Sequence, residues 1–113
     1  MPRTSKIAGS PPAVIGRTLE RLGANIRIAR IRRRLTQQDL ARRVGVSRFV
    51  VADVERGKPT TAVSAYLGAL WVLGLLGQLD DVADPDRDQE GATLALARSP
   101  KTARSRRTLS DDF

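Results

Sequence analysis

The side chains best suited to recognising another molecule lie between residues 37 and 58. The guanidinium of Arg48 can donate two parallel hydrogen bonds to O6 and N7 of guanine. Phe49 has no donor, but its ring can cover the methyl group of thymine. Asp53 can accept from N4 of cytosine, or it can hold Arg48 or Arg56 in a short ion pair. Gln37 can reach a phosphate, together with the free backbone N–H groups at a helix start.

Capping residues place these side chains on two short helices joined by a turn. Thr36 is expected to cap the first helix, and Asp39 completes a capping box three residues later. Gly45 ends that helix, because glycine readily adopts a positive φ. Ser47 is expected to cap the second helix, and Gly57 ends it.

Two longer helices are predicted around this pair. Apolar residues recur every three or four positions from residue 13 to residue 34. Gly16 and Gly23 interrupt that pattern, which predicts a late start or a break near Gly23. The segment 61–74 and the leucines after it are more apolar than one helix of a small monomer needs. We therefore predict a homodimer interface, or the edge of the core, at Trp71, Leu75, Leu76 and Leu79.

The 113 residues suffice for one small domain with tails. No segment has the alternation of a strand, so we expect an all-α fold, a small bundle of four to five helices. Residues 1–12 are expected to be a disordered segment and residues 13–79 the folded domain. Residues 80–113 are expected to form an acidic turn, a short helix over 87–98 and a basic, disordered tail.

Composition favours an anionic partner and argues against catalysis. Lys and Arg number 20 against 12 Asp and Glu, a net charge of +8 that suits nucleic acid or an anionic membrane. The basic helix lacks the bulky apolar face of a membrane-surface helix. There is no cysteine, which excludes disulfides and thiolate metal sites, and no histidine, which removes the commonest general base and nitrogen metal ligand. The acidic residues 80–88 lack the glycine and final glutamate of a calcium loop.

These observations exclude several classes of protein. We predict that the chain is not an enzyme and has no cofactor and no metal site. No apolar run reaches the length of a membrane span, and the first residues lack the apolar core of a signal peptide. A cytoplasmic protein without a membrane partner is expected.

The segments "LTQQDLARRVGVS" and "VERGK" resemble the lambda-repressor-like (Cro and Xre type) helix-turn-helix family, over about residues 25–76. The resemblance implies that the second helix enters the major groove of double-stranded DNA. It also implies an ion pair between Arg30 and Glu55. Arg48 could instead neutralise a phosphate, and Phe49 could instead pack within the domain or against the neighbouring turn. The DNA-binding residues implied are Gln37, Gln38, Ser47, Arg48, Phe49, Asp53, Arg56 and Lys58.

The chain also resembles a narrower group, the HipB-like antitoxins, through residues 65–88, "LALARSP" and the terminal "DDF". That resemblance implies a homodimer that represses its own operon from a palindromic operator and neutralises a HipA-like kinase toxin. Residues 98–113 would then bind the toxin, with Phe113 as an apolar anchor. A stand-alone Xre-family transcriptional repressor is the alternative.

Overall fold

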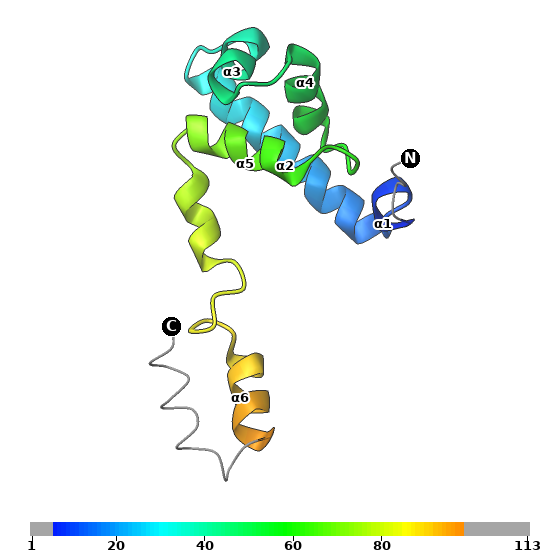
Figure 1. Ribbon diagram of the computed structural model, residues 1–113, viewed down its shortest axis with the longest axis vertical. Coiled ribbons are helices and arrows are strands. Elements are labelled where there is room, and N and C mark those ends of the chain that lie inside the picture. The colour runs from blue at the N-terminus through cyan, green and yellow to red at the C-terminus, as the bar shows by residue number, and fades with distance from the viewer. Residues whose placement is uncertain (1–5, 99–113) are drawn as a thin grey trace. The chain divides into compact units, whose positions relative to one another are not determined.

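The computed structural model describes residues 6–98, and all their regular structure is helical (Figure 1). The all-α prediction is confirmed: no strand occurs in this part of the chain. Two short elements, the first and the 3₁₀ helix, add to the bundle that the sequence predicts. The elements are α1 (Lys6–Gly9), α2 (Ala13–Arg32), α3 (Gln37–Val44), α4 (Arg48–Arg56), α5 (Val63–Val72), the 3₁₀ helix η1 (Leu76–Asp81) and α6 (Gln89–Arg98).

A single apolar core holds α2 to α5 together. α4 packs against α2, α3 and α5, and so lies at the centre of these contacts. Burying these apolar side chains is the main stabilising contribution to the fold. The core is made of Ile26, Ala29, Leu40, Ala41, Val51, Val54, Ala65, Tyr66, Ala69, Leu70 and Leu73.

The caps predicted for α3 and α4 are confirmed. The amide of Asp39 donates to Oγ1 of Thr36 over 3.0 Å, and the amide of Thr36 donates to the Asp39 carboxylate over 2.9 Å. Ser47 accepts from the amide of Val50 over 3.3 Å. Gly45 and Gly57 end the two helices with φ values of 89° and 72°. Each cap satisfies a backbone group that the helix end leaves without a partner.

α2 contradicts the expected interruption, because it runs unbroken through Gly16 and Gly23. Gly23 lies where the backbone of α4 comes close to α2. A Cβ atom there would lie 2.5 Å from the carbonyl oxygen of Val54 and 2.6 Å from that of Glu55. Glycine is therefore required at position 23 by helix packing, and the flexibility that predicted a break is suppressed by its neighbours.

The chain divides into two compact units, with the boundary between Gly77 and Gln78. In the second unit α6 begins at Gln89, after a series of turns, and none of its residues is buried. In the first unit, Lys6–Gly9 form one helical turn where the sequence predicts disorder. The predictions for residues 1–5 and for the tail 99–113, including the anchor Phe113, lie outside the described residues.

Candidate functional site

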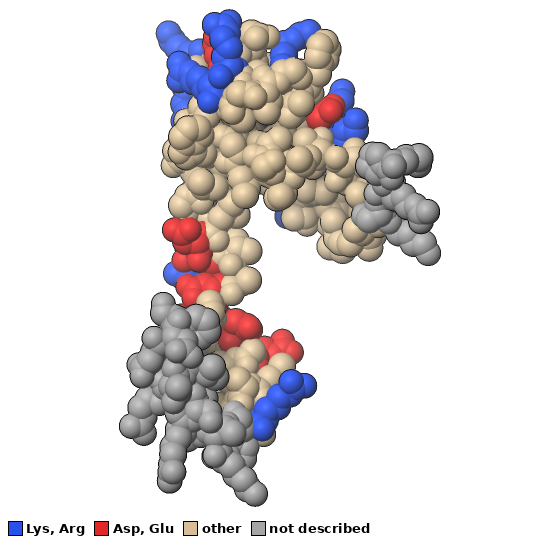
Figure 2. Space-filling view, viewed as in Figure 1, with Lys and Arg blue, Asp and Glu red and all other residues tan. Residues whose placement is uncertain are grey.

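The candidate site lies on the side of α4 that faces away from the core. Val51 and Val54 are buried on one side of this helix. Arg48 and Phe49 project from its first turn on the other side, and Phe49 is 70% exposed. On the face shown in Figure 2, Lys and Arg side chains gather over α3 and α4. The arrangement leaves the outer side of a short helix exposed, with Arg48 at its start and Arg56 at its end.

A buried polar network sets the position of α4. The Arg30 Nε lies 2.6 Å from Glu55 Oε2, and its Nη2 donates to Oε1 over 3.1 Å. The Gln37 amide also donates to Glu55 Oε1 over 3.1 Å, and Arg30 Nη1 donates to the carbonyl of Leu35 over 2.8 Å. The pair is buried and not at the surface: the Glu55 side chain is only 3% exposed. Residues of α2 and α3 thus hold the C-terminal end of α4 through one carboxylate.

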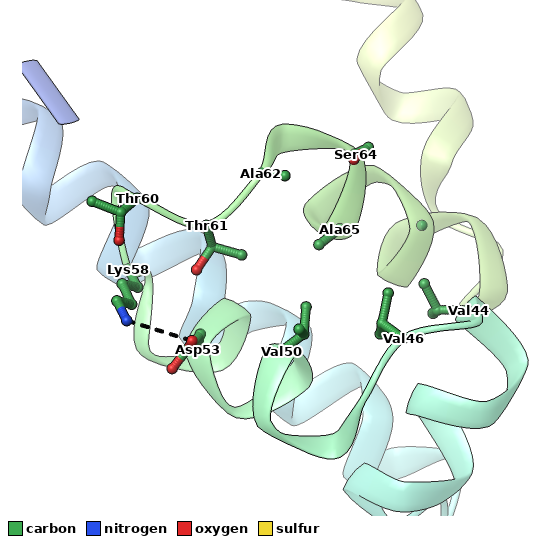
Figure 3. Close-up of a pocket in the computed structure, with 11 residues that line it drawn as sticks. Val44, Val46, Val50, Asp53, Lys58, Thr60, Thr61, Ala62, Ser64 and Ala65 are labelled. Carbon is green, nitrogen blue, oxygen red and sulfur yellow. Dashed lines mark ion pairs between the residues drawn. The ribbon is translucent and has the colours of Figure 1, made fainter. Parts of the chain in front are cut away.

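Asp53 forms ion pairs with the two cations that follow it. Its carboxylate contacts Arg56 and lies 3.6 Å from the Lys58 ammonium. Figure 3 shows the contact with Lys58 at the rim of a groove. Of the partners predicted for Asp53, the structure therefore shows Arg56, and it adds Lys58 as a second one. The three side chains form a charged cluster at the end of α4.

Arg48 has an aromatic neighbour in place of a carboxylate. Its guanidinium carbon lies 5.1 Å from the centroid of the Phe49 ring, within the range of a cation–π interaction. Phe49 does not pack into the domain, which was the alternative considered for it. Both side chains are exposed on the first turn of α4, so one ligand can contact them together.

A groove of about 500 Å³ separates α4 from the start of α5 (Figure 3). Valine side chains line one side of it, and the hydroxyl-bearing Thr60, Thr61 and Ser64 line the other. These hydroxyls can donate to phosphate oxygens beside α4. The sequence prediction missed them; the signal was three small hydroxyl-bearing residues within five positions, from the end of α4 into the first turn of α5.

Tyr66 attaches the loop that carries Thr60 and Thr61 to α5. Its hydroxyl donates to the carbonyl of Lys58 over 2.8 Å. Burial raises the pKa of Tyr66, and the nearby Asp53 charge adds to the effect. The phenol therefore stays a hydrogen-bond donor near neutral pH.

The other residues predicted from the sequence lie in different environments. Gln38 is exposed on the first turn of α3, and the Ser47 hydroxyl serves the α4 cap. Leu75 and Leu76 are half-buried and pack against the core, whereas Trp71 is 63% exposed on α5 and Leu79 is exposed. The four residues predicted to form an interface thus do not share one environment.

Other kinds of site find little support between residues 6 and 98. Over that range, no three acidic side chains gather in a way that could hold a metal ion. None of the helices there is both long enough and apolar enough to cross a bilayer.

Comparison with known families adds one match. A family model described as a helix-turn-helix domain matches residues 21–82, which is more than half of the chain. The matched range includes α3 and α4, the turn between them and the buried network that supports them. The chain matches no curated protein and no solved structure.

Proposed function

Because the chain belongs to the helix-turn-helix domain family, which implies DNA binding, we propose that it reads a specific DNA sequence with α4 as its recognition helix. One observation carries the proposal. α4 is anchored through the buried Glu55, while Arg48 and Phe49 project from its opposite side, free of the core. A rigidly held helix with exposed donors is what direct readout in the major groove requires.

In this proposal the surrounding residues position the helix on the DNA backbone. Arg56 and Lys58 neutralise phosphates, and the hydroxyls of Thr60, Thr61 and Ser64 donate to neighbouring phosphates. Gln37 braces Glu55 with its side chain, so its contact with phosphate is through the backbone at the start of α3. Asp53 stays off the DNA and sets the spacing of Arg56 and Lys58.

The protein acts as a homodimer on a palindromic operator in the same proposal. Two recognition helices about 34 Å apart would enter successive major grooves. The exposed Trp71, with Leu79, supports a contact between protomers, because a large indole left in water gains much from burial. Leu75 and Leu76 would contribute only their exposed parts.

Such a dimer would be a cytoplasmic, non-enzymatic repressor of transcription. The more specific form of the proposal is a HipB-like antitoxin that also neutralises a HipA-like kinase toxin. Supporting it is a second unit with an unburied helix and an acidic surface, suited to a protein partner. A stand-alone Xre-family repressor is the alternative; a kinase-like gene beside this one would favour the antitoxin.

The test is selection from a pool of random-sequence duplexes by the full-length protein, followed by fluorescence anisotropy on the enriched site. Arg48→Ala should weaken binding to that site by roughly tenfold to a hundredfold, the value of a bidentate contact to guanine, with little change on random DNA. Arg56→Ala should weaken both and make the salt dependence less steep. A pool without any enriched sequence would contradict the proposal.

A further inference from the structure

Arg48 and Phe49 form a unit small enough to contact two neighbouring base pairs. The guanidinium carbon and the ring centroid are 5.1 Å apart, and both groups project from the first turn of α4. Adjacent base pairs stack about 3.4 Å apart. The 5.1 Å separation exceeds one step and is shorter than two, so a guanidinium in the plane of one base pair leaves the Phe49 ring within reach of the next.

The donors of Arg48 are available for a base. Among residues 6–98, no carboxylate lies within ion-pair distance of its guanidinium. The carboxylate closest along α4 belongs to Asp53, which is already paired with Arg56 and Lys58. Contact with the ring restricts the motion of the guanidinium without using its N–H groups. Arg48 is thus prepared for two hydrogen bonds to guanine.

The ring of Phe49 needs an apolar group on the neighbouring base pair. In the major groove that group is the methyl on C5 of thymine, since the other base edges there present hydrogen-bonding atoms. Cytosine methylated at C5 carries the same methyl group at the same position. A contact made only with this methyl group cannot distinguish the two pyrimidines.

Resting on the proposed DNA-binding function, we propose that Arg48 and Phe49 together read a 5-methylpyrimidine adjacent to guanine. The pair accepts thymine and 5-methylcytosine alike, and discriminates against unmethylated cytosine. Where the site contains cytosine next to guanine, binding then depends on methylation of that cytosine. Arg48 supplies the preference for guanine, and Phe49 supplies the preference for the methyl group.

The experiment uses the full-length protein and four duplexes that differ at the pyrimidine beside the guanine read by Arg48. They carry thymine, deoxyuridine, cytosine or 5-methylcytosine. Deoxyuridine removes only the methyl group of thymine, so the thymine duplex should bind about fourfold more tightly, as expected for burying one methyl-sized group. 5-Methylcytosine should bind more tightly than cytosine by a similar factor.

Two variants assign the effect to the ring. Phe49→Ala should bind the thymine and deoxyuridine duplexes equally, while keeping its preference for guanine. Val63→Ala removes another exposed apolar side chain, on α5, and should leave the fourfold ratio unchanged. An enriched site that lacks such a pyrimidine, or equal binding of thymine and deoxyuridine by the unaltered protein, would overturn the inference while the proposed function stands. A pool with no enriched site would contradict both this inference and the proposed function.

Discussion

The two units of the chain are stabilised in different ways. In the first unit, residues 6–77, four helices share an apolar core and a buried ion pair. In the second unit, residues 78–98 have no buried side chain, and Leu94 and Leu96 of α6 are more than half exposed. A ten-residue helix without tertiary packing is marginal in water. The comparison teaches that burial holds the helices of the first unit together, whereas the described residues of α6 bury no side chain.

The units also differ in charge. Residues 1–34 carry a net charge of +8, whereas residues 80–97 carry −5. A cationic surface attracts DNA, and an acidic segment is repelled by it. By charge alone, residues 1–34 therefore suit an anionic ligand such as DNA, and residues 80–97 suit a cationic one.

The largest expected difference between the units is in amide hydrogen exchange. Core amides of α4 should exchange only through global unfolding, at a cost of roughly 5 kcal/mol or more. Amides of α6 should open at a cost near zero, because no core must be broken. Exchange followed by NMR measures both. Equal protection of α4 and α6 would break the comparison.

Removing the buried carboxylate should have the next largest effect. Glu55→Ala leaves the buried Arg30 without its partner, which should lower the free energy of unfolding by about 3–5 kcal/mol. The matched change in the second unit, Glu90→Ala on the exposed face of α6, should alter it by less than about 0.5 kcal/mol. Urea denaturation measures both variants. A small loss for Glu55→Ala would show that the network does not anchor α4.

Adding a methyl group at Gly23 should destabilise the protein, but by less than Glu55→Ala does. A Cβ there meets the backbone of Val54, so Gly23→Ala should lower the free energy of unfolding by about 1–3 kcal/mol. The same change at Gly16 meets nothing within 4 Å and should stabilise α2 by about 0.5–1 kcal/mol. In the second unit, Gly91→Ala meets only the end of the Asp88 side chain, which accepts from the Gly91 amide over 2.9 Å, and should cost less than Gly23→Ala because a side chain can shift more easily than backbone. Thermal denaturation of the three variants checks this order, and equal effects at Gly16 and Gly23 would contradict it.

The smallest expected effect is a pH dependence at the α3 cap. Hydrogen bonds from Thr36, the backbone one first, lower the pKa of Asp39 below its ordinary value of 3.8. A carboxyl whose pKa is lowered on folding stabilises the protein above its unfolded pKa, and that contribution is lost as pH falls through the folded pKa. NMR titration of the Asp39 carboxyl should show this, and Thr36→Ala should raise the pKa. A value of 3.8 or above in the unaltered protein would contradict the cap.

Much of the first unit could be predicted from the sequence because its signals are local. Thr36 with Asp39, Ser47 with Val50, and the glycines at 45 and 57 act within one turn of their own helix. The apolar spacing of α2 likewise predicts the face that Ile26 and Ala29 bury. The family model bears out the helix-turn-helix at the same place. The candidate DNA-binding residues remain predictions.

Other features could not be predicted because they depend on which helices meet. Gly23 had the sequence signature of a helix break, yet α4 crosses there and requires the absence of a side chain. Leu75, Leu76 and Trp71 belong to the same apolar segment of the sequence, yet only the two leucines lie against the core. The hydroxyls of Thr60, Thr61 and Ser64 line the groove beside α4 only because of the way α5 packs on α4.

By itself, then, the sequence determined the two short helices α3 and α4, their caps and the candidate set around Arg48, because each depends on neighbours within a few residues. Only the tertiary structure decided how that set is arranged. Arg30 and Glu55 are 25 positions apart, and their burial together follows from the packing of α2 on α4. Along the chain, Asp53 could pair with Arg48, Arg56 or Lys58. In the structure it pairs with Arg56 and Lys58, and Arg48 lies against the Phe49 ring instead. The physical reason is that a cap is satisfied within one turn, whereas a buried charge needs a partner from a distant helix.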